Sequence, residues 1–129
     1  MFSARLFLAL FAAAMPSIGV AQDNADLGRA IFQDRQLGLC LLCHPDPAAS
    51  MSPQADLAPP LNNIGARLSA KDIKEHLTSP DKFNPQTIMP AYGRAQGLTN
   101  VSRRFVGRPI LAPNELDAVV AYLSQLRAP

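Results

Sequence analysis

The apolar residues of this chain recur at helical spacing in three places, and no stretch of any length alternates in the manner of a β-strand. The first place is Asp26–Gln36. There Leu27, Ala30 and Ile31 follow the i, i+3, i+4 spacing of one helix face, which Phe32 widens. The pattern predicts an all-α fold.

Two further helices carry end signals as well as apolar faces. Ser69 and Asp72 form a capping-box pattern at the start of the second helix, and Pro80 follows its end. Pro113 suits the first turn of the last helix, where Glu115 also favours the positive helix end. The apolar stripe of this last helix consists of Leu116, Val119, Val120 and Leu123.

Two long segments lack convincing periodicity. Pro45–Pro60 contains five prolines, so we expect a loop there. Pro80–Pro113 is about as long as a whole helical hairpin, and a compact domain rarely contains so much irregular chain. We therefore expect this second segment to wrap around something or to contain short elements.

The first residues have the three parts of a secretory leader. Arg5 supplies a positive charge, Leu6–Ala14 is an unbroken apolar run, and Gly19-Val20-Ala21 offers small residues for cleavage before Gln22. The apolar run is too short to span a bilayer, and no other long apolar run follows. We expect residues 1–21 to be a signal peptide and residues 22–129 to form one domain in the periplasm, with no membrane span.

Composition narrows the class of protein further. The formal net charge is +2, with 12 basic and 10 acidic residues, which argues against nucleic-acid binding. The chain has no tryptophan, and three of its six phenylalanines lie in the expected leader. A core with so few large apolar side chains suggests that another group fills its centre.

Both cysteines fall in Cys40-Leu41-Leu42-Cys43-His44, the CxxCH signature of covalent haem c attachment. Two thiols one turn apart can each bond a vinyl group of one haem, and the adjoining histidine can then bind the iron. A redox-active pair would require a βαβ context, a local disulfide would remove little chain entropy, and zinc would need more ligands. One haem c, attached through Cys40 and Cys43, is the prediction.

The sixth ligand of the iron has three candidates: Met51, His76 and Met89. Met51 is too close to His44 in sequence to reach the opposite haem face without a sharp reversal. His76 is expected to be a solvated helix residue, whereas Met89 precedes a proline inside the long irregular segment. We favour Met89, and we expect the Pro59 carbonyl to hold the second ring nitrogen of His44.

Six segments follow one another in a recognisable order: CLLCH, APPLNNIGARLS, TIMPAY, GLTNV, VGRPIL and NELDAVVAYLSQL. In this order the chain resembles the SoxX family, the small monohaem c-type cytochrome subunits of the SoxAX complex in bacterial sulfur oxidation. The resemblance covers essentially all of residues 22–129. It implies a small, haem-centred cytochrome c fold with packed N- and C-terminal helices, in which Gly28 and Phe32 contact the last helix near Tyr122. Gly28 by itself already suggests the close approach of another element.

The resemblance also implies a function. His44 and Met89 would be the axial ligands, and Cys40 and Cys43 the thioether anchors. The partner would be a SoxA-type dihaem or monohaem cytochrome, which carries the catalytic cysteine of an L-cysteine S-thiosulfotransferase acting on a SoxYZ-type carrier protein. This chain, with no catalytic residue of its own, would pass electrons from thiosulfate oxidation to a soluble cytochrome c.

Two other functions stay open on the residues alone. One is a free-standing cytochrome c shuttle with no obligate partner, and the other is a haem enzyme or gas sensor with an open sixth position. The distribution of charge gives a clue to the kind of partner, since residues 82–114 contain five basic residues and no acidic one. This basic segment is either a solvated loop or a face that steers an acidic partner.

Overall fold

The computed structural model describes residues 18–45 and 55–127. The helices within these ranges are α1 (Ile18–Gln33), α2 (Ile64–Arg67), α3 (Ala70–Thr78) and α4 (Pro113–Gln125). Three 3-10 turns accompany them: η1 (Cys40–Leu42), η2 (Pro80–Lys82) and η3 (Arg103–Phe105). The described ranges contain no strand, so the predicted all-α fold is confirmed there. The apolar run Leu6–Ala14 and Met51 lie outside the described residues.

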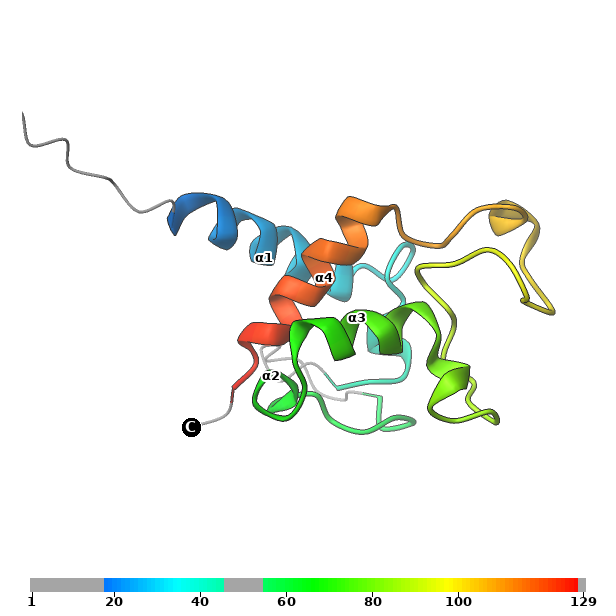
Figure 1. Ribbon diagram of the computed structural model, residues 1–129, viewed down its shortest axis with the longest axis horizontal. Coiled ribbons are helices and arrows are strands. Elements are labelled where there is room, and N and C mark those ends of the chain that lie inside the picture. The colour runs from blue at the N-terminus through cyan, green and yellow to red at the C-terminus, as the bar shows by residue number, and fades with distance from the viewer. Residues whose placement is uncertain (1–17, 46–54, 128–129) are drawn as a thin grey trace, which may run out of the picture.

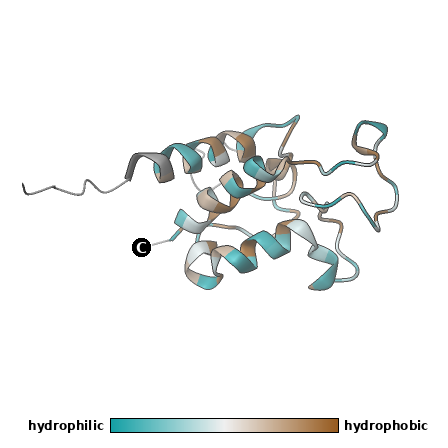
Figure 2. Ribbon diagram, turned by 45° about the horizontal axis from the view of Figure 1, so that its top comes forward, coloured by the Kyte–Doolittle hydropathy of each residue, from teal (hydrophilic) through white to brown (hydrophobic). Residues whose placement is uncertain are grey.

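α4 forms the centre of the fold, with α1 on one side and α3 on the other (Figure 1). α1 approaches α4 most closely at Gly28, where an added Cβ would lie 1.9 Å from the Ala118 carbonyl oxygen. One turn further on, the Phe32 ring packs against Tyr122 with 5.5 Å between ring centroids. Both predicted contacts of α1 with the last helix are therefore present. In the coloured part of α1, the most hydrophobic stretches lie in the second half of the helix (Figure 2), and α1 packs against α4.

The buried face of α1 differs from the predicted one. Leu27 is 45% exposed and Ala30 is also exposed, whereas Ala25, Gly28 and Ile31 are buried. The sequence predicted that Leu27 and Ala30 lie on the covered face because both follow helical spacing with Ile31. In the structure the α4 backbone lies directly on Gly28, and this close approach decides which face of α1 is covered.

The first helix also ends earlier than predicted, at Gln33 instead of Gln36. The Asp34 carboxylate accepts hydrogen bonds from the backbone N–H groups of Gln36 (2.6 Å) and Leu37 (2.9 Å). An aspartate that binds its own following backbone in this way forms a turn in competition with the helix. The chain consequently leaves α1 in a tight turn that leads to the CxxCH segment.

The predicted second helix is α3, and its capping box is confirmed. Ser69 Oγ accepts a hydrogen bond from the Asp72 backbone N–H, and the Asp72 carboxylate accepts one from the Ser69 N–H. Ile73 and Leu77 bury the inner face of α3 against α4. The four-residue helix α2 was not predicted, because it is too short to show periodicity. It docks through Gly65, whose N–H donates to the Leu126 carbonyl at 3.0 Å.

The long segment between α3 and α4 contains only the two short turns η2 and η3, in agreement with its lack of periodicity. It extends away from the helices and returns to them, and η3 lies at its outer part (Figure 1). Tyr92 fixes its middle. The Tyr92 N–H donates to the Leu77 carbonyl at 2.8 Å, and the Leu111 N–H donates to the Tyr92 carbonyl at 3.1 Å.

Candidate haem-binding site

The CxxCH segment folds as the single turn η1. The N–H groups of Cys43 (3.1 Å) and His44 (2.9 Å) both donate to the Cys40 carbonyl. Leu39, directly before the turn, adopts a left-handed conformation with φ of 58°, which is uncommon for a residue with a branched side chain. Cys40 is buried, Cys43 is half-buried, and both are free thiols. The turn therefore presents two thiols and one imidazole from five consecutive residues.

The His44 ring is held by the loop that precedes α2. His44 Nδ1 lies 2.8 Å from the Pro59 carbonyl oxygen, the contact that the sequence predicted. A carbonyl can only accept a hydrogen bond, so Nδ1 donates its proton to it and Nε2 keeps a free lone pair. The Ala58 N–H donates to the Cys43 carbonyl at 2.9 Å and ties the same loop to the turn. The imidazole is thus oriented and left with one nitrogen available for a metal.

The Cys40 thiol has a hydrogen-bond partner that the sequence analysis missed. Its sulfur shares a side-chain hydrogen bond with Tyr92, a residue 4% exposed. Burial raises the pKa of the Cys40 thiol to about 11, and the Tyr92 hydrogen bond partly opposes this rise. Burial also raises the pKa of Tyr92. Both groups are therefore uncharged at neutral pH, and Tyr92 joins the long segment to the first cysteine of the motif.

Met89 lies three residues before Tyr92 and packs half-buried against the core. Its N–H donates to Thr87 Oγ1 at 3.1 Å, which fixes the local backbone. Ile88, in contrast, is 83% exposed. The structure brings Cys40, Cys43, His44 and Pro59 together in one place, and it places Met89 half-buried at the edge of the core.

His76 lies on α3 in a well-defined local setting. Its ring stacks on Phe83, with 3.5 Å between centroids and 12° between planes. His76 Nδ1 is 2.9 Å from the Asp72 carbonyl oxygen, to which it donates. The expectation of a solvated side chain is thus only partly right, because Phe83 covers one face of the ring and the residue is half-buried.

No group of three or more His, Cys, Asp or Glu side chains in the described ranges converges to hold a metal ion. No helix in the same ranges is long and apolar enough to cross a bilayer.

A helical fold in which α1 and α4 pack around a glycine, next to a CxxCH turn with its histidine held by a carbonyl, defines a small c-type cytochrome. Comparison with protein-family models and with curated protein sequences gives no match. Among solved structures, the crystal structure of SoxXA from P. pantotrophus matches with a TM-score of 0.72 at 26% identity. The match covers 81% of this chain and 82% of the other. The chain is therefore SoxX-like, and both the predicted cytochrome fold and the SoxX resemblance are confirmed.

Proposed function

We propose that the chain carries one haem c, bonded through the thiols of Cys40 and Cys43. The donor set fits such a group, because two free thiols lie at the ends of one turn and the next residue is an imidazole with a free nitrogen. When bound, the haem supplies a one-electron redox centre. It also supplies the large apolar group that the chain's few aromatic residues do not.

We further propose His44 and Met89 as the axial ligands. His44 presents Nε2, and the Pro59 carbonyl holds the ring so that its orientation is already set. Met89 offers a thioether, which raises the reduction potential of a haem that has histidine on its other side. Two observations support this assignment. Met89 lies half-buried against the core, and Tyr92, three residues further along the chain, is hydrogen-bonded to Cys40.

In the cell, the chain serves as the SoxX subunit of a SoxAX-type complex in the periplasm, after removal of residues 1–21. The match to SoxXA over most of both chains is the observation that carries this proposal. The SoxA-type partner joins thiosulfate to a cysteine of a SoxYZ-type carrier, a reaction that releases two electrons. This chain has no third cysteine. It accepts the electrons one at a time and passes them to a soluble cytochrome c.

The ligand assignment is tested by the spectrum of the haem-loaded protein. We expect a low-spin, methionine-ligated reduced spectrum that carbon monoxide does not readily change. Met89→Ala should open the sixth position and allow carbon monoxide to bind, while the matched variant Met51→Ala should keep the parent spectrum. If Met89→Ala retains that spectrum, Met89 is not the ligand, and His76→Ala then tests the remaining candidate.

The complex is tested by purification from cells that make the protein at its natural level. A tagged chain should co-purify with a second c-type cytochrome that contains the catalytic cysteine. Isolation of the tagged chain alone, with a methionine-ligated spectrum, would instead indicate a free-standing electron shuttle. The mass of the same preparation tests export, because cleavage after Ala21 leaves Gln22 as the first residue.

A further inference from the structure

The basic segment of residues 82–114 divides into paired and unpaired charges. Lys82 Nζ lies 3.0 Å from a Glu75 carboxylate oxygen, and Arg94 forms an ion pair with Asp81. The other three basic residues have no acidic partner within the described ranges, and all three are exposed: Arg103, Arg104 and Arg108. We call these three residues the arginine cluster. The positive charge of the segment is thus concentrated at and just after η3.

Two guanidinium groups of the arginine cluster are held in place around one aromatic ring. Cζ of Arg104 lies 4.5 Å from the centre of the Phe105 ring, and Cζ of Arg108 lies 5.6 Å from it. Arg108 Nε donates to the Arg104 carbonyl at 2.7 Å. These contacts fix side chains that would otherwise lose much conformational freedom on binding, so less entropy is lost when a ligand binds them.

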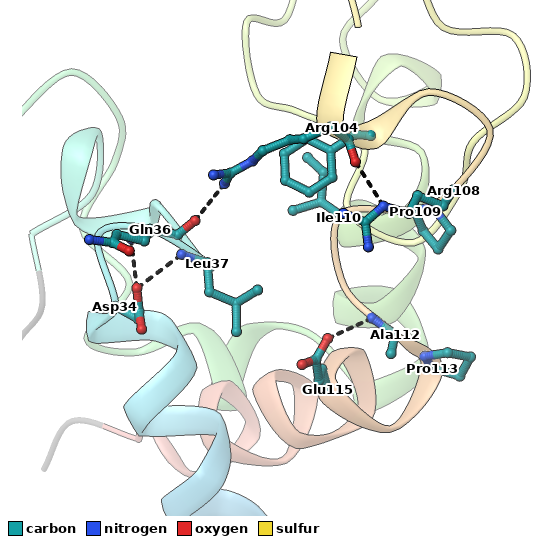
Figure 3. A pocket seen from close by; sticks show the side chains of 11 residues that line it. Asp34, Gln36, Leu37, Arg104, Arg108, Pro109, Ile110, Ala112, Pro113 and Glu115 are labelled. Carbon is teal, nitrogen blue, oxygen red and sulfur yellow. Dashed lines mark hydrogen bonds between the residues drawn. The ribbon is translucent and has the colours of Figure 1, made fainter. Parts of the chain in front are cut away.

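Two members of the arginine cluster, Arg104 and Arg108, line an open cleft of about 780 Å³ between the turn after α1 and the start of α4 (Figure 3). Arg104 reaches across it and donates to the Gln36 carbonyl at 2.6 Å. The cleft also contains two carboxylates, and both are bound to backbone N–H groups. Asp34 accepts from the turn after α1, and Glu115 accepts from the Ala112 N–H at 2.7 Å. Arg104 and Arg108 keep N–H groups free for an incoming anion, whereas the carboxylates already accept backbone hydrogen bonds, and Arg103 gives the three arginines one charge more than the two carboxylates.

We propose that this cleft and the arginine cluster dock an acidic surface of a partner protein. Arg104 and Arg108 lie beside the Phe105 ring but extend in different directions, since Arg104 reaches toward Gln36 while Arg108 stays beside Pro109 (Figure 3), and the adjacent Arg103 adds a third exposed cation. This spread matches several carboxylates on a protein surface better than one small anion. The purpose of this docking site follows only if the proposed function is right. Gln36 lies four residues before Cys40, so a partner docked at the cleft would lie beside the turn that holds the haem.

The test uses the haem-loaded mature protein and hexaglutamate as a stand-in for an acidic surface, with hexaglutamine as the uncharged peptide. Calorimetry at low ionic strength should detect hexaglutamate binding that molar salt abolishes. Arg104→Gln combined with Arg108→Gln should weaken binding about fivefold, the sum of two exposed charge pairs. The matched control removes two exposed arginines of α1 and α2, Arg29→Gln with Arg67→Gln, and should bind like the parent protein.

Arg103→Glu gives a second test that breaks no side-chain interaction, because the exposed Arg103 side chain forms no hydrogen bond, ion pair or ring contact within the described ranges. It should weaken hexaglutamate binding as well. An equal loss in the Arg29/Arg67 control would overturn the proposal, since it would reflect net charge alone. Sulfate binding at the cluster without hexaglutamate binding would also overturn it, in favour of a small-anion site.

Visible spectra of the same samples separate this inference from the proposed function. A methionine-ligated spectrum without peptide binding removes only the docking site. Peptide binding by a protein without that spectrum removes only the proposed methionine ligation.

Discussion

Replacing Gly28 by alanine should force α1 and α4 apart, because Gly28 lies where the two helix backbones meet. The new Cβ would lie 1.9 Å from the Ala118 carbonyl oxygen and 2.9 Å from Tyr122 Cβ. Restoring a normal contact requires a local separation of about 1.5 Å. The Phe32–Tyr122 ring pair lies one turn away and would loosen with it.

The expected loss of stability can be worked out from these contacts. Overpacking a tight core site costs about 1–3 kcal/mol, and a loosened aromatic pair adds about 1 kcal/mol. The alanine recovers about 1 kcal/mol through its higher helix propensity. The net destabilisation is therefore about 2 kcal/mol, which corresponds to a fall of about 10 °C in the unfolding temperature of a domain of this size.

The measurement is thermal unfolding of the haem-loaded protein followed by circular dichroism. Ala30→Gly calibrates the propensity term, because Ala30 is an exposed position in the same helix and should lose only about 1 kcal/mol. A Gly28→Ala protein that unfolds at or above the parent temperature would refute the close approach of the helices.

Three further variants test other parts of the fold. Hydrogen bonds from Ser69 lower the pKa of the Asp72 carboxyl. They therefore add to the free energy of unfolding above the unfolded-state pKa of Asp72, and this contribution disappears as the pH falls through the folded-state pKa. Ser69→Ala should thus destabilise more in urea unfolding at neutral pH than in strong acid, and equal losses would contradict this. Lys74→Met removes the half-exposed ion pair between Lys74 Nζ and the Asp117 carboxylate, which are 2.6 Å apart. The free energy of unfolding should fall by about 0.5 kcal/mol in low salt and by nearly nothing in molar salt. A loss that does not depend on salt would point to packing instead. Gly97→Ala places a side chain at φ of 68° and should cost about 1 kcal/mol in the same assay, while unchanged stability would show that this turn relaxes freely.

The sequence predicted features that depend on neighbouring residues. The Ser69 capping box, the apolar stripe of α4 and the CxxCH turn are each encoded within a few positions, so their chemistry can be read directly from the order of residues. The Pro59 contact with His44 was also foreseen, because a ligating imidazole needs an acceptor and a nearby turn can supply it.

Features that depend on distant parts of the chain were missed or wrongly assigned. The covered face of α1 follows from how α4 lies on Gly28, which the pattern of α1 alone does not contain. The Tyr92 contact with Cys40 joins residues more than 50 positions apart. Likewise, the ion pairs of Lys82 and Arg94 neutralise two charges that a simple count assigns to one basic segment.

The two backbone hydrogen bonds of Tyr92 turn one long connection into two shorter ones. The entropy lost on closing a flexible loop grows with its length, so anchoring the midpoint makes each half easier to order. Met89 belongs to the first half, three residues before the anchored Tyr92, whereas the arginine cluster belongs to the second half. The second half of the connection can therefore change in length or charge without moving Met89, so the arginine cluster can vary while the position of the methionine is kept.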